Sequence, residues 1–182
     1  MDKNRALVAI FCLAGAYSSA QASQFTEDDA VQVVATFAEA AACASDLDSD
    51  DFPVVKISEA EDPELMGHYG ERYAVAWVGD LGCEGGRAAT WHISYVGVGV
   101  ANLPFVDLET PPITLQFIDV HSLEVNEDDN IVVKGQRYDF REGSGNWDFI
   151  DKTAVITPSG DLLESLVHVD GETHIESDVT DY

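Results

Sequence analysis

Residues 73–78 read YAVAWV and residues 91–96 read WHISYV, and these two stretches decide the fold. In each, one set of side chains alternates with another at a period of two, which is typical of β-strands. The glycine-rich segment GDLGCEGG, residues 79–86, separates them. Glycine-rich connections between strands favour hairpin loops, so we expect the two strands to pair antiparallel.

The segment that precedes this pair predicts a helix. Thr26 is followed by three acids, which places a capping hydroxyl and favourable negative charge at a helix start, with Asp29 near the capping-box position. Apolar residues then recur at helical spacing, namely Val31, Val34, Ala38 and Ala41, with Ala30, Val33 and Phe37 beside them. We expect this helix to end within residues 43–46 and to pack its alanine-rich face on the sheet.

Further strands are predicted after residue 112, where apolar runs are separated by ordinary turn residues. They cover residues 113–125, 131–140, 147–157 and 162–169, and residues 101–112, with three prolines, form an irregular or edge segment. Short connections favour antiparallel pairing. The predicted fold class is therefore α+β, with one N-terminal helix packed on a mainly antiparallel β-meander sheet. The alternative is a β-sandwich or a partly open barrel with a flanking helix.

The first 22 residues have the pattern of a cleaved signal peptide. Lys3 and Arg5 precede a short apolar run, and the sequence AQA at residues 20–22 matches a small-x-small cleavage site. We therefore expect residues 23–182 to form a single exported domain with an acidic C-terminal tail, located in the periplasm or outside the cell. The apolar run is too short to span a bilayer, so we expect no membrane anchor.

Cleavage at this site removes Cys12 and leaves Cys43 and Cys83. In an oxidising compartment two cysteines outside any C-x-x-C pair indicate a structural disulfide. Such a bond would tie the end of the helix to the glycine-rich loop. The chain-entropy model assigns it about 4 kcal/mol of stabilisation.

Charge is the second strong signal in the chain. Asp and Glu number 34 against nine Lys and Arg, for a formal net charge of −25, and the acids are spread along the whole length. This excess argues against nucleic acid as a partner, because that affinity depends on basic contacts. It agrees with adaptation to salty surroundings or with attraction to a basic protein or another cationic ligand.

Two acidic segments are candidate metal sites. Asp46, Asp48 and Asp50 alternate in one short loop, as carboxylate ligands of Ca²⁺ do, but the EF-hand pattern fails there. Ca²⁺ is thus the only cofactor that the sequence suggests. At the C-terminus, residues 168–178 carry His168 and His174 among four acids, but a hairpin at residues 170–171 would place the two histidines on opposite faces.

No catalytic signature appears: the patterns G-x-S-x-G, H-E-x-x-H and S-x-x-K are all missing. His92 could act as a base if Asp80 or Glu84 oriented it. We instead expect a non-catalytic binding or interaction protein, whose contact surface is the sheet with the loop that carries Asp80, Glu84 and Arg87. The alternatives are a Ca²⁺-dependent binding or structural domain, and a hydrolase whose residues converge only in space.

Overall fold

The predicted helix forms where the sequence places it. The structure, a computed structural model, describes residues 25–46, 52–57, 71–82, 89–98, 103–141, 146–169 and 172–175. Helix α1 (Glu27–Ala41) begins with a complete capping box, in which the Thr26 hydroxyl accepts from the Asp29 backbone N–H and the Asp29 carboxylate accepts from the Thr26 N–H at 2.9 Å. The helix ends two residues earlier than expected, because Ala42 is already extended and directs the chain into the first strand.

The strands form two antiparallel sheets. The first, sheet A, contains β1 (Ser45–Asp46), β2 (Val54–Ile57), β3 (Arg72–Gly79), β4 (Thr90–Val98), β5 (Pro104–Val106) and β6 (Ile113–Leu115). Strands β3 and β4 pair along their whole length at its centre; β1 and β2 both pair with β3, and β5 and β6 both pair with β4. The predicted pairing of the two alternating stretches is confirmed.

The second sheet, sheet B, is a meander. It consists of β7 (Asp119–Val125), β8 (Ile131–Arg141), β9 (Asn146–Ile156), β10 (Leu162–Val169) and β11 (Glu172–Ile175), in the order β11-β10-β9-β8-β7. The single strand expected at residues 113–125 is divided between the sheets. Residues 116–118 pass from one to the other, and the Trp91 indole donates to the Ile118 carbonyl there at 2.9 Å.

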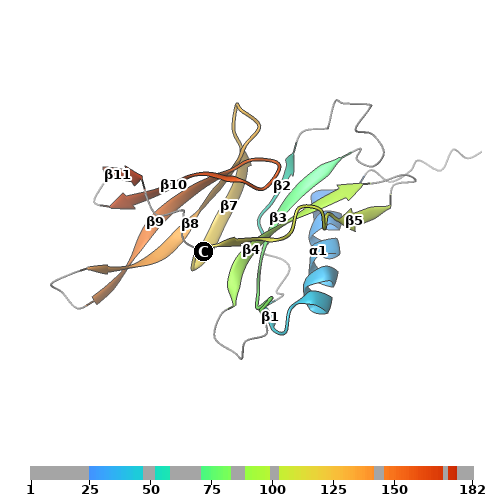
Figure 1. Ribbon diagram of the computed structural model, residues 1–182, viewed down its shortest axis with the longest axis horizontal. Helices are drawn as coiled ribbons and strands as arrows, with labels where there is room; N and C mark the ends of the chain where they lie inside the picture. Colours follow the sequence, from blue (N-terminus) through green and yellow to red (C-terminus); the bar gives the residue numbers. More distant parts are fainter. Residues whose placement is uncertain are drawn as a thin grey trace, which may run out of the picture.

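Three layers follow from the alternation along β3 and β4. Tyr73, Val75 and Trp77 face the helix, whereas Ala74 and Ala76 face sheet B. Because both faces of sheet A are covered, β3 is apolar almost throughout. Each large side chain that is fully buried there contributes about 2 kcal/mol to the free energy of folding. Figure 1 shows the helix beside sheet A and sheet B extending away from it. The predicted α+β fold class is confirmed. The strands form two sheets, as in the sandwich alternative, and not the one meander sheet of the main prediction.

One hairpin of sheet B is longer than its neighbours. Strand β7 pairs with β8 only as far as Gln136, and β10 pairs with β9 only as far as Asp151. Residues 137–141 and 146–150 continue to pair with each other beyond those points, and we call this two-stranded part the distal ribbon.

In the described part of the chain no helix is long and apolar enough to cross a membrane.

Candidate functional site

His92, the candidate base, is a core residue. It is 3% exposed and lies 4.9 Å from the Trp77 ring, centroid to centroid. Its Nε2 atom lies 3.0 Å from the Gly79 carbonyl oxygen, which only accepts, so Nε2 carries the hydrogen and Nδ1 accepts from the Thr114 hydroxyl at 3.2 Å. Burial lowers the pKa of His92, against the opposing effects of the Gly79 carbonyl and the Asp80 charge. Both ring nitrogens are engaged, which suits packing and not proton transfer.

The proposed interaction loop is described only at its start. Asp80 is 7% exposed, and its carboxylate accepts from the Gly82 backbone N–H at 3.1 Å. It therefore shapes the entry to the loop and is largely shielded from solvent. Glu84 and Arg87 lie outside the described residues.

The chain around Cys43 is held against the end of β3. The Cys43 N–H donates to the Asp80 carbonyl at 3.0 Å, and the Asp80 N–H donates to the Ala44 carbonyl at 2.8 Å. Cys43 is disulfide-bonded. Cys83 lies outside the described residues, so the pairing of these two cysteines stays a prediction, although the contact between Cys43 and Asp80 brings the required segments together.

The candidate metal ligands are not gathered by the described part of the chain. The backbone of Asp46 closes β1, while Asp48 and Asp50 lie outside the described residues. Among the residues that the structure covers, no three His, Cys, Asp or Glu side chains form a group that could hold a metal ion. His168 pairs with Thr173 and His174 with Val167, which puts the two imidazoles on opposite faces of sheet B, as the hairpin prediction required.

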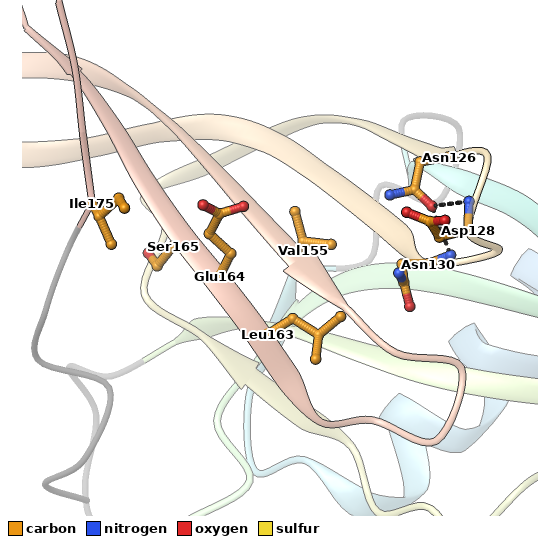
Figure 2. A pocket seen from close by; sticks show the side chains of 8 residues that line it. All are labelled: Asn126, Asp128, Asn130, Val155, Leu163, Glu164, Ser165 and Ile175. Atoms are coloured by element: carbon orange, nitrogen blue, oxygen red, sulfur yellow. Dashed lines mark hydrogen bonds between the residues drawn. The ribbon is translucent and has the colours of Figure 1, made fainter.

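A pocket of about 500 Å³ opens on the face of sheet B that points away from sheet A (Figure 2). It lies between the β7–β8 turn and strands β9, β10 and β11. Its lining combines two carboxylates, two amides, one hydroxyl and three aliphatic side chains: Asp128, Glu164, Asn126, Asn130, Ser165, Val155, Leu163 and Ile175. Among these residues none is basic.

Hydrogen bonds fix the turn that forms one side of the pocket. The Asn126 side-chain oxygen accepts from the N–H groups of Asp128 at 3.0 Å and of Asn130 at 2.9 Å. Asp129 adopts a positive φ of 60°, which Asp and Asn tolerate better than most residues. The turn thus presents Asp128 toward the pocket without needing a ligand to order it.

The other side of the pocket depends on an irregularity in β10. The pairing of β9 and β10 shifts register between Leu162 and Glu164, which leaves Leu163 as an extra, exposed residue. Glu164 pairs with Val155, and Ile175 of β11 pairs with Leu166. Figure 2 shows Glu164 and the turn residue Asp128 on either side of Val155. An apolar floor is therefore bordered by two negative charges.

This arrangement suits an organic cation. An ammonium or guanidinium group gains charge-assisted hydrogen bonds from Asp128 and Glu164, while an attached aliphatic stem covers Val155 and Leu163. The pocket is open to solvent, so water competes for the same carboxylates.

Sequence reasoning identified residues 126–130 only as a turn and missed the pocket. The acid- and amide-rich turn was the available signal, whereas the contributions of Leu163 and Ile175 depend on the bulge and on β11 pairing. Comparison of the chain with protein-family models, with characterised proteins and with solved structures gives no match.

Proposed function

We propose that this protein is an exported, non-catalytic binding protein for a cationic polypeptide, and that the pocket of sheet B receives one of the partner's lysine or arginine side chains. The observation that carries this proposal is the lining of the pocket, with carboxylates on two sides of an aliphatic floor and no basic residue among the described lining residues. A neutral group would gain nothing from the charge of the two exposed carboxylates, and an anionic group would be repelled by them.

The charge of the whole chain supports the same conclusion. A net charge of −25 attracts a cationic partner from a distance and raises the rate of association, most strongly at low salt. The leader-like residues 1–22 support export, and a disulfide at Cys43 agrees with an oxidising compartment. The engaged state of His92 supports binding over hydrolysis.

The pocket is tested with small probes that differ only in charge. We expect n-butylammonium to shift the amide resonances of Asp128 and Glu164 in an NMR titration, and n-butanol and butyrate to have little effect. Replacing Glu164 by Gln removes one charge and weakens n-butylammonium binding about tenfold, or ~1.4 kcal/mol.

Glu172→Gln is the matched control, because Glu172 is an exposed acid of sheet B on the β11 face opposite to Ile175. It changes the net charge by the same amount and leaves the probe affinity within a factor of two, as expected for a remote surface charge. Equal losses in the two variants would show that only net charge matters. Tight Ca²⁺ binding that displaces the probe would assign the pocket to the metal instead.

A further inference from the structure

Three aromatic side chains are exposed together on the distal ribbon. Tyr138 is 51% exposed, Trp147 64% and Phe149 60%. The Tyr138 ring centroid lies 6.2 Å from that of Trp147 and 5.0 Å from that of Phe149. Tyr138 pairs directly with Phe149, and Trp147 lies two residues from Phe149, so the alternation of β-strands places all three on one face of the ribbon.

The position of this aromatic face argues for a binding role. The ribbon lies beyond the last described pairs with β7 and β10, so these rings do not complete the core between the sheets. Exposed apolar groups that gather in one place are typical of interaction surfaces. Tyr and Trp are also the residue types most enriched where binding energy concentrates.

The neighbouring charge indicates which partner fits. Asp151 is exposed, lies two residues from Phe149 and therefore shares the aromatic face. A guanidinium group stacks on an aromatic ring and donates hydrogen bonds to a carboxylate at its edge, which is the combination that this face offers. A second copy of the chain is a poor occupant, because two molecules of net charge −25 repel each other.

We infer that the aromatic face of the distal ribbon, formed by Tyr138, Trp147 and Phe149, is a docking surface for an arginine-bearing segment of a basic polypeptide. This inference depends on the proposed function for the cationic character of the partner. It adds a second contact region, on the same sheet as the pocket but at the opposite end of β9, and it assigns stacking as the mode of recognition there.

The test uses a short peptide of alternating arginine and glycine, with an otherwise identical glutamate peptide as the charge control. Trp147 is 64% exposed, whereas Trp77 is fully buried and the half-buried Trp91 donates its indole N–H to the Ile118 carbonyl. A change in tryptophan emission on peptide binding therefore reports chiefly on the ribbon. We expect the arginine peptide to change the emission and to bind, by calorimetry, about tenfold more weakly to a Tyr138→Ser, Phe149→Ser double variant. The glutamate peptide should not bind.

Leu103→Ser is the control variant, because Leu103 is 68% exposed but lies outside the ribbon, and it should leave the affinity unchanged. Equal affinity of wild type and double variant overturns the docking surface. A dimer in sedimentation that the double variant abolishes also overturns it, because the face then binds a second copy. If either result is obtained but n-butylammonium still binds the pocket, the proposed function is retained and only the docking surface is rejected. If the arginine peptide binds the ribbon as expected but n-butylammonium does not bind the pocket, the pocket is rejected and the docking surface is retained.

Discussion

In the half of the β8–β9 hairpin that lies against sheet A, Val133, Ala154 and Ile156 are buried, whereas in the distal ribbon the rings of Tyr138 and Phe149 face solvent. The two halves belong to the same strands, pair in one continuous register and share the alternation of side chains. They differ in the face that carries the apolar groups: Val133, Ala154 and Ile156 point toward sheet A, whereas Tyr138 and Phe149 lie on the opposite face. In addition, β7 and β10 flank the first half alone. Apolar side chains on a strand therefore become core or surface according to what packs on them.

The largest expected contrast is between core substitution and ribbon substitution. Ile156 is fully buried between the sheets and pairs with Ile131, so Ile156→Ala leaves a cavity and lowers the free energy of unfolding by about 4 kcal/mol. Urea denaturation measures this loss. A change below about 1 kcal/mol would mean that the two sheets do not share a packed core.

The boundary between the halves holds a buried lysine. Lys152 is 5% exposed, and its ammonium lies 5.3 Å from the Phe117 ring centroid. Burial first, and the charge of Arg137 second, lowers the pKa of Lys152 from 10.5 to about 8. Between these pH values the unfolded chain retains a proton that the folded chain has lost, so this group makes the fold more stable as pH rises.

The variant Lys152→Met isolates that effect. We expect the unfolding free energy of the wild type, relative to this variant, to increase from pH 8 to pH 10.5 by at most about 3 kcal/mol. All other groups are the same in the two proteins, so their contributions cancel in the difference. A difference that stays constant across the range would show that Lys152 is solvated.

Gly135 pairs with Lys152 and marks the same boundary on β8. A Cβ atom there would lie 2.0 Å from the Asp119 carbonyl oxygen and 2.7 Å from the Phe117 ring. Gly135→Ala must therefore displace the start of β7, and we expect a loss of about 2 kcal/mol in urea denaturation. An unchanged urea midpoint would indicate that residues 117–119 move to accommodate the new methyl group without loss of stability.

The smallest effect belongs to the ribbon itself. Tyr138→Ser removes two cross-strand aromatic contacts, with Phe149 and with Trp147, from an exposed ribbon, so we expect a loss of about 0.5 kcal/mol. Thermal unfolding by circular dichroism checks this value, with Ile156→Ala as the reference. A loss as large as that of Ile156→Ala would mean that the rings pack against the rest of the protein. They would then not be free to bind a partner, and the proposed docking surface would be rejected.

Local signals in the sequence predicted the helix and the central strands, because Thr26 and Asp29 form a cap from adjacent residues and because β3 and β4 alternate without interruption. The division of residues 113–125 was not predictable in this way. No turn residue marks residues 116–118, so no local signal shows that the chain leaves β4 after Leu115 and pairs with β8 from Asp119 onward. The pocket was missed for a similar reason, since its lining assembles only after β10 bulges and β11 folds back.

The meander order of sheet B also has a kinetic consequence. Each of its pairings joins strands that follow one another in the chain, so the entropy lost in closing each loop is small. In sheet A, by contrast, Ser45 pairs with Gly79 and Ile93 with Ile113 across long intervening segments. Topologies with local contacts form early. The topology therefore favours early formation of sheet B relative to the β1 and β6 pairings of sheet A, which close longer loops.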